Sequence, residues 1–411
     1  MNGRRILLGA AAGILAAAGT AGARDGLPPL PWEPRSDWID VRSRGAAGDG
    51  RADDTEALRK TVAAARAHGR DALAYLPAGT YLVRETLRLE GRDYRLGGAG
   101  WGSRLVWKGP PGGTILAVHD PENLVLEHLS IGSHDAGKMD NAIDIHQTGT
   151  DRPSRMTYDG VFVYGMYQKD PLRKGLRLEG LGEKAVVSLP HVQGNLRIVD
   201  CARATILAGC SYEGTVVVEG KDRRRGGLTG FLTRLGTSCP RALIVRDNQS
   251  VVMSDFYIEQ AENGYLFEGS PGDPPGRVTL QGAKVDFFDA ARGEARAAGT
   301  ALEFRGYSGR VFFGPNQFYC NPERVRIRQE GDAPLELFLL GCCFYKTRLD
   351  VEKGPGLRLY LAGNEAVASP AAAVEDVLPP EGLAAAAEAL DDLRRLGRED
   401  LRIHHGIESP R

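Results

Sequence analysis

Residues 278–285 read VTLQGAKV, and residues 251–258 read VVMSDFYI. In both stretches two apolar residues stand two apart, a turn residue follows, and two more apolar residues again stand two apart. Side chains two apart in a strand point to the same side of it. Each stretch therefore predicts two short strands that meet at a sharp bend and bury the same side. Gly282 suits that bend, because glycine accepts a backbone conformation with positive φ.

This bent-strand template recurs between Tyr75 and Val367. Other copies are Leu124, Leu126, Leu129 and Ile131; Met156, Tyr158, Val161 and Val163; Leu337, Leu339, Cys342 and Phe344; and Leu359, Leu361, Asn364 and Ala366. Further apolar strand starts fall at Leu176, Leu196, Val216, Leu243, Leu266, Leu302, Val325 and Leu349, commonly 20 to 24 residues apart. A repeat of this length is typical of one coil of a solenoid, which buries its apolar side only by stacking on its neighbours.

The repeat predicts an all-β fold, a single-stranded right-handed parallel β-helix over residues 38–370. A β-sandwich or a propeller would favour two-residue hairpin turns between strands of equal length. Asp159 and Gly160 instead interrupt a strand pattern. The solenoid is therefore the favoured architecture.

Helices are expected at both ends of the solenoid, because its terminal coils would otherwise expose apolar surface. Asp53 and Glu56 are spaced as a capping box for a helix that stops at Gly69. In a C-terminal tail of residues 371–411, residues 381–397 carry an amphipathic pattern. The apolar positions of that pattern are Leu383, Ala387, Leu390 and Leu393. We expect an N-terminal capping helix and a C-terminal helical tail.

Residues 1–23 have the layout of a secretory signal peptide. Two arginines at positions 4 and 5 precede an apolar run, and Ala-Gly-Ala at residues 21–23 suits a cleavage site. We therefore expect a secreted or periplasmic protein, and the paired arginines leave a twin-arginine signal open. The proline-rich residues 24–37 predict an extended lead-in.

The charge of the chain is balanced, with 52 Lys and Arg against 53 Asp and Glu. This balance argues against nucleic acid as a partner. After the signal peptide no stretch approaches the ~18 consecutive apolar residues of a membrane span, so membrane insertion is not expected. The six cysteines are too sparse for a disulfide-rich scaffold and fit no zinc pattern.

Residues 45–55 read GAAGDGRADDT, and residues 76–82 read LPAGTYL. Together these motifs resemble the N-terminal signature of the pectate-lyase-like superfamily, which includes rhamnogalacturonase- and polygalacturonase-related enzymes and some phage tailspikes. The resemblance covers residues 38–107 and implies a β-helical protein that degrades polysaccharide. Because these motifs consist of turn glycines and helix-capping residues, we expect Asp49, Asp53 and Asp54 to be structural.

The catalytic set that the polygalacturonase branch of this superfamily would imply is not assembled in the chain. That set is Asn-x-Asp, a later Asp-Asp, Gly-His-Gly and Arg-x-Lys. The sequence contains no Asn-x-Asp, Gly-His-Gly or Arg-x-Lys, and its two Asp-Asp pairs, at 53–54 and 391–392, lie in the expected end helices. A polygalacturonase mechanism is therefore not expected.

Outward side chains of adjacent coils lie ~5 Å apart and form a groove suited to an extended glycan. Asp144 and His146 alternate with apolar residues that point inward, so both should face outward and can share acid and base roles. The candidate catalytic residues are Asp144, His146, Lys169, Arg173 and Glu259. The candidate substrate-binding residues are Tyr164, Tyr167, Lys174 and Tyr257.

Each of these groups has a chemical use and a simpler alternative. The basic loop of residues 164–174 suits β-elimination on a uronic acid, in which a cation neutralises the sugar carboxylate and a base removes a proton. Glu259, with Glu262 nearby, can act in hydrolysis or bind calcium, the one cofactor considered. The alternative in each case is an ordinary charged surface.

We expect an exported enzyme that acts on an acidic polysaccharide, either a lyase or a divergent glycoside hydrolase. A non-catalytic β-helix that binds glycan or serves a surface structure stays open as the alternative. Trp101 and Trp107 are further candidates for stacking on sugar rings.

Overall fold

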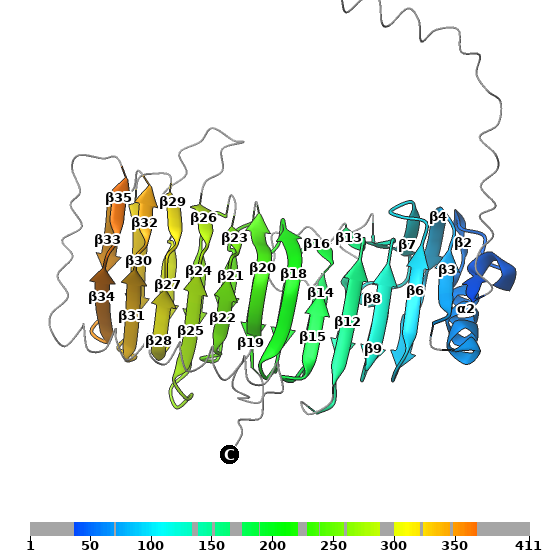
Figure 1. Cartoon of the computed structure of the whole chain (residues 1–411), viewed down its shortest axis with the longest axis horizontal. Coiled ribbons are helices and arrows are strands. Elements are labelled where there is room, and N and C mark those ends of the chain that lie inside the picture. Colours follow the sequence, from blue (N-terminus) through cyan, green and yellow to red (C-terminus); the bar gives the residue numbers. More distant parts are fainter. Residues whose placement is uncertain are drawn as a thin grey trace, which may run out of the picture.

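The computed structural model describes residues 37–69, 71–133, 139–149, 153–164, 175–188, 190–220, 228–237, 239–258, 261–287, 300–320, 324–345 and 348–367. As predicted, they form a right-handed parallel β-helix whose coils stack in sequence order (Figure 1). The predicted signal peptide and the predicted C-terminal tail lie outside the described residues.

The coils contribute strands to three faces, and each strand pairs in parallel with its equivalents in the neighbouring coils. Faces 1 and 2 belong to one 24-stranded sheet, because β18 (Ala204–Tyr212) and β20 (Leu228–Thr237) run through the bend between them. Face 3 is a separate 11-stranded sheet.

Face 1 contains β1 (Trp38–Asp40), β3 (Leu73–Leu76), β6 (Tyr94–Gly98), β9 (Asn123–Glu127), β12 (Ser154–Asp159), β15 (Ala185–Ser188), β22 (Val251–Ser254), β25 (Gly276–Gln281), β28 (Gly309–Phe313), β31 (Leu335–Leu340) and β34 (Leu357–Ala362). Face 2 contains β2 (Asp49–Asp53), β4 (Gly79–Val83), β7 (Ser103–Trp107), β10 (Ser130–Gly132), β13 (Phe162–Tyr164), β16 (His191–Gln193), β23 (Tyr257–Ile258), β26 (Lys284–Phe287), β29 (Gln317–Cys320), β32 (Cys343–Tyr345) and β35 (Glu365–Val367). Face 3 contains β5 (Leu87–Glu90), β8 (Gly113–His119), β11 (Met139–His146), β14 (Leu176–Glu179), β17 (Leu196–Val199), β19 (Val216–Glu219), β21 (Leu243–Val245), β24 (Tyr265–Glu268), β27 (Leu302–Arg305), β30 (Arg324–Glu330) and β33 (Arg348–Glu352).

The bent-strand template is confirmed in detail. All of its inward positions in residues 251–258 and 278–285 are at most 2% exposed and belong to one continuous core. The predicted bends lie where face 1 meets face 2, and Gly160, Gly282 and Gly341 have φ of 59°, 67° and 65° there. We call this edge of the solenoid the face 1–2 corner.

Helix α2 (Thr55–His68) closes the first coil, as predicted (Figure 1). The predicted capping box of Asp53 and Glu56 is wrong, because Asp54 is the N-cap residue, without a side-chain cap hydrogen bond, and the helix begins at Thr55. The carboxylate of Asp53 accepts from the Thr55 amide at 3.1 Å. The buried Asp54 carboxylate accepts instead from the backbone amides of Ala47 at 2.7 Å and Leu82 at 3.3 Å. These two aspartates are therefore structural, as expected.

One predicted strand start is out of register. Tyr265, not Leu266, pairs with Leu243 on one side and Leu302 on the other. The stretch from Tyr265 to Phe267 is apolar at every position, so alternation alone did not show which side faces the core. Leu266 points outward on face 3.

The structure also bears on Trp107, on the cysteines and on membrane-spanning helices. Trp107 is 4% exposed and packs in the core, so of the two roles that the sequence left open for it, sugar stacking and packing, the structure shows packing. Cys201, Cys239 and Cys342 are buried free thiols, as expected of structural cysteines. Within the described ranges, no helix has the length and apolar character needed to cross a membrane.

Candidate functional site

Asp144 and His146 both face outward on β11, as the alternation predicted. The carboxylate oxygens of Asp144 lie 3.2 and 3.3 Å from the guanidinium of Arg177 on the next strand of face 3. Arg177 also contacts Glu179. Asp144 is therefore held by an ion pair, with 24% of its side chain exposed.

His146 lies beside a second histidine. Its ring centroid is 5.2 Å from that of His119, which is in register with it on β8. Burial lowers the pKa of His146, and the nearby charges of His119 and Arg177 lower it further. The imidazole is therefore neutral at neutral pH and can accept a proton.

The remaining candidate residues do not gather around this pair. Tyr164 and Tyr257 lie on β13 and β23 of face 2, whereas Asp144 and His146 lie on face 3. Lys169, Arg173, Glu259, Tyr167 and Lys174 lie outside the described residues. The structure thus brings Asp144 and His146 together and separates them from the two described tyrosines.

An aromatic row lies on face 2, near its start. Trp101 is 59% exposed, yet its indole donates to the Gly160 carbonyl at 3.1 Å and stacks on Phe162 at 5.3 Å. Phe162 in turn packs against Tyr164 at 6.1 Å and His191 at 5.1 Å. A large apolar ring that is exposed and still fixed in place is a feature of binding surfaces.

Two carboxylates stand beside this row at the face 1–2 corner. Asp159 on β12 is in register with Glu127 on β9, one coil away. Arg95 holds Glu127 through two hydrogen bonds of 2.9 and 3.2 Å. The imidazole of His128 lies 3.9 Å from the Asp159 carboxylate, and Gly160, whose carbonyl holds Trp101, follows Asp159 directly.

Glu127 and His128 were not among the predicted site residues, and together with Asp159 and Trp101 they form what we call the corner cluster. Asp159 was interpreted as a turn residue, and it does stand at a bend. One feature of the sequence could have pointed to this cluster. His128 occupies a bend where other copies of the template carry glycine, and its φ is 51°. The register that joins Glu127 to Asp159 spans 32 residues of sequence and required the structure.

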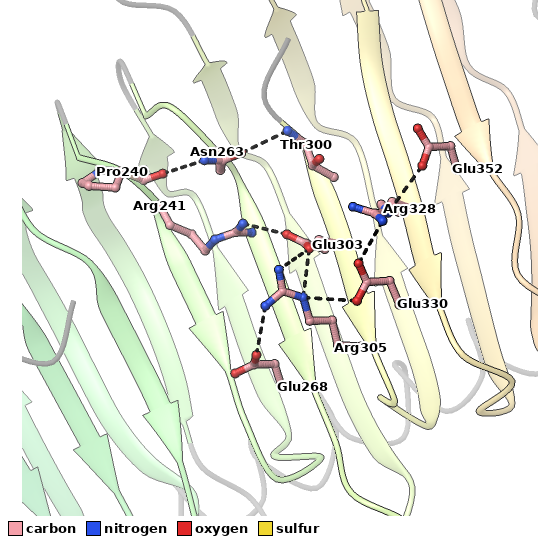
Figure 2. A network of polar contacts seen from close by, with 10 residues as sticks. All are labelled: Pro240, Arg241, Asn263, Glu268, Thr300, Glu303, Arg305, Arg328, Glu330 and Glu352. Atoms are coloured by element: carbon pink, nitrogen blue, oxygen red, sulfur yellow. Dashed lines mark hydrogen bonds and ion pairs between the residues drawn. The ribbon is translucent and has the colours of Figure 1, made fainter. Parts of the chain in front are cut away.

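A second set of charged residues on face 3 is fully engaged in ion pairs. Figure 2 shows Arg305 between Glu268, Glu303 and Glu330. Its guanidinium nitrogens lie 3.6, 2.6 and 3.6 Å from the carboxylates of these three residues. Arg241 contacts Glu303 from the other side at 2.6 Å. Burial opposes ionisation of Glu303, but Arg241 and Arg305 outweigh it and lower the pKa of this carboxyl. The network is therefore structural.

A cavity of about 480 Å³ opens at the far end of face 1. Arg277, Arg310 and Arg358 line it, together with Glu336 and Asp332. Glu336 accepts from Arg310 at 2.6 Å and lies 3.8 Å from Arg358. Three guanidinium groups against two carboxylates give this cavity an excess of positive charge.

Among the residues that the structure describes, no three His, Cys, Asp or Glu side chains are grouped as a metal site requires.

The chain was compared with known families and structures. Residues 38–106 match the family model described as rhamnogalacturonase A/epimerase, pectate lyase-like. No curated protein matches the chain. Among solved structures, the catalytic unit of a GH87 alpha-1,3-glucanase from Streptomyces thermodiastaticus is 14% identical with a TM-score of 0.42, over 83% of this chain and 71% of that chain.

Two further solved structures are similar at the same level. The pre-mature gene product 12 of bacteriophage phi29 is 12% identical with a TM-score of 0.42, over 80% of this chain and 52% of that chain. The A-module of mannuronan C-5 epimerase AlgE6 from Azotobacter vinelandii is 18% identical with a TM-score of 0.33, over 81% of this chain and 96% of that chain. Over residues 38–106, the resemblance to the pectate-lyase-like superfamily is confirmed by the family match.

Proposed function

We propose that the protein is a polysaccharide-active enzyme that binds a linear glycan along the face 1–2 corner and hydrolyses it at the corner cluster. One observation carries the proposal. Glu127 and Asp159 are outward carboxylates in register on adjacent coils, directly beside an exposed tryptophan that is fixed by a hydrogen bond and a stacked ring.

The one-coil separation of the strands that carry these carboxylates is compatible with glycoside hydrolysis. Adjacent strands in a sheet lie ~4.8 Å apart, and the two carboxyl groups of retaining glycosidases lie ~5 to 5.5 Å apart. In such a pair one carboxyl group protonates the glycosidic oxygen, while the other attacks the anomeric carbon. Arg95 fixes Glu127 through its hydrogen bonds, which suits the nucleophile; Asp159 beside His128 then acts first as the acid and afterwards as the base when water hydrolyses the glycosyl-enzyme ester.

The surroundings support an acidic glycan as the substrate. Trp101 and Phe162 offer flat apolar rings to the sugar faces. The exposed Arg104 lies on the same face, two strands from Phe162.

A second candidate reaction is β-elimination at Asp144 and His146. The observation that favours it is the contact of His146 with His119 on face 3, where burial and the nearby His119 and Arg177 lower the pKa of His146. In that reaction the imidazole removes the C5 proton of a uronic acid, the C4–O glycosidic bond breaks as the C4–C5 double bond forms, and water protonates the departing sugar oxygen. A guanidinium neutralises the sugar carboxylate.

The decisive experiment incubates the protein with pectic, alginate and glycosaminoglycan substrates, with and without calcium. Reducing ends and absorbance near 235 nm are both recorded, and binding is measured in parallel. We expect new reducing ends without new absorbance. Asp159→Asn and Glu127→Gln should each lower turnover at least ~100-fold, as expected for a group that acts in the transition state.

Asp255→Asn is the control, because Asp255 is a carboxylate at another bend of the same corner several coils away, where it takes the positive-φ position (φ 53°) that Gly160 holds beside Asp159. It should leave turnover unchanged. Absorbance near 235 nm that His146→Asn abolishes would establish the lyase instead. Binding that is lost in Trp101→Ala, without any turnover, would establish a glycan-binding protein, and absence of both binding and turnover would refute a role in glycan recognition.

A further inference from the structure

Face 3 carries an apolar row on its outer side. Val217, Ile244 and Leu266 are in register on three successive strands, and each alternates with residues that point into the core. They form a cluster apart from that core and are only 2, 4 and 5% exposed. Val199, outward on the preceding strand, is 0% exposed. Apolar side chains on the outside of a solenoid are buried only if something covers them.

The exposed fractions of neighbouring charged side chains show how far along face 3 the covered region extends. In register with the apolar row, the side chains of Arg197 and Glu303 are 14 and 5% exposed, whereas in the neighbouring outward column exposure rises from 9% at Glu219 to 46% at Arg305. Towards either end of the same face, His119 is 47% exposed and Glu352 is 51% exposed. The shielded region therefore runs from about β14 to β27, which is five strand spacings or ~24 Å.

We propose that residues 381–397 dock on face 3 as an amphipathic helix and cover this apolar row. Seventeen residues in an α-helix span ~25 Å, which matches the length of the shielded region. Leu383, Ala387, Leu390 and Leu393 recur at helical spacing and would face Val217, Ile244 and Leu266.

The chain has the length to place the segment there. The last described residue, Val367, lies in the terminal coil, and residues 368–380 can extend to ~43 Å. From β33 back to β27 the distance along the solenoid is two strand spacings, or ~10 Å. This docking goes beyond the proposed hydrolysis, and it assigns the middle of face 3 to the chain itself while leaving the face 1–2 corner open to glycan.

The test measures the reactivity of a thiol placed in the row. Ile244→Cys in the full chain should react slowly with a maleimide, as followed by peptide mass spectrometry. Adding Leu390→Asp should raise that rate at least tenfold, because a charge on the apolar side of the segment releases it. Glu388→Gln is the matched control on the polar side, and it should leave the rate unchanged. Val252→Cys, at a position on face 1 that is 37% exposed, should react fast in every background.

A photocrosslinker at residue 244 gives an independent readout that does not rely on a destabilising substitution. Crosslinks to peptides from residues 381–397 would support the docking. Crosslinks to residues 288–299, or an unchanged thiol rate in both Leu390→Asp and Leu383→Asp, would overturn it. Glycan hydrolysis does not enter either readout, so a failure here is distinguishable from a failure of the proposed function.

Discussion

Gly48 shows how a single residue of the sequence signature serves the fold. Its φ is 61°, and an added Cβ would lie 2.8 Å from the ring of the fully buried Tyr81. Gly48→Ala should lower the free energy of unfolding by about 2 to 4 kcal/mol, from backbone strain and overpacking together. Gly45→Ala, at a φ of 98° with open space around it, should lose only about 1 kcal/mol. Urea unfolding of both variants measures the difference, and equal losses would contradict the role of Tyr81.

His146 makes the stability of the protein depend on pH. Because its pKa is lowered in the folded state, folding favours the neutral imidazole. This contribution is complete above the ordinary titration range of histidine and is lost as the pH falls through the lowered pKa. His146→Asn should therefore lose less stability than the parent between pH 7 and pH 5.

The titration itself can be followed by NMR of histidine-labelled protein. His119→Asn should move the pKa of His146 back towards its ordinary value, because one of the two nearby positive charges is then gone. A His146 signal that titrates at or above the ordinary histidine value in the parent would contradict the assignment.

At the scale of elements, the arginine–glutamate network stabilises the packing of neighbouring strands on face 3. Glu303 is 5% exposed and accepts from Arg241 and Arg305, so Glu303→Gln removes the carboxylate that pairs with Arg241 and leaves Arg305 with its longer contacts to Glu268 and Glu330. We expect a loss of about 2 kcal/mol in unfolding free energy. Glu352→Gln, at the exposed end of the network, should lose less than about 0.5 kcal/mol.

The difference in unfolding free energy between the parent and Glu303→Gln should depend on pH. The pKa of Glu303 is lowered, so the ionised carboxylate stabilises the fold at neutral pH and this contribution disappears as the pH falls through the lowered pKa. The parent and Glu303→Gln should therefore converge in stability in acid. A constant difference from pH 7 to pH 3 would contradict an ionic role.

Strands and bends were predictable because each is local. In residues 278–285 the alternation and a single glycine specify both strands and the bend between them. The same reasoning failed at Leu266, since three apolar residues in a row carry no alternation. It also placed Tyr164 with Asp144, because the sequence does not state which face of the coil a strand joins.

The corner cluster required information that no local pattern holds. Glu127 and Asp159 meet only through the register between two coils, and Trp101 reaches them from a third. Coil length varies along the chain, so a constant repeat cannot be assumed when aligning outward residues. The predictions of export, of calcium binding and of the C-terminal helix concern features that the described residues do not test, and they stay predictions.

At the scale of the whole molecule, the stability of a solenoid depends on elements that cover the apolar surface of its terminal coils. Helix α2 protects the first coil with Leu58, Val62 and Ala65, which are 0, 9 and 3% exposed. Leu58→Asp puts an unpaired charge into that contact and should cost about 4 kcal/mol. Because the uncovered coil end exposes apolar residues and unpaired strand edges, the variant should also self-associate.

Size-exclusion chromatography over a range of concentrations distinguishes the two effects, since simple destabilisation does not depend on concentration as association does. Lys60→Asp, on the exposed side of the same helix, is the control and should remain at the elution volume of the parent. If Leu58→Asp unfolds without associating, the helix contributes stability alone. If Lys60→Asp also associates, the change in charge, and not the loss of the helical cap, causes the association. Association in Leu58→Asp alone identifies α2 as the element that keeps the first coil from pairing with another chain.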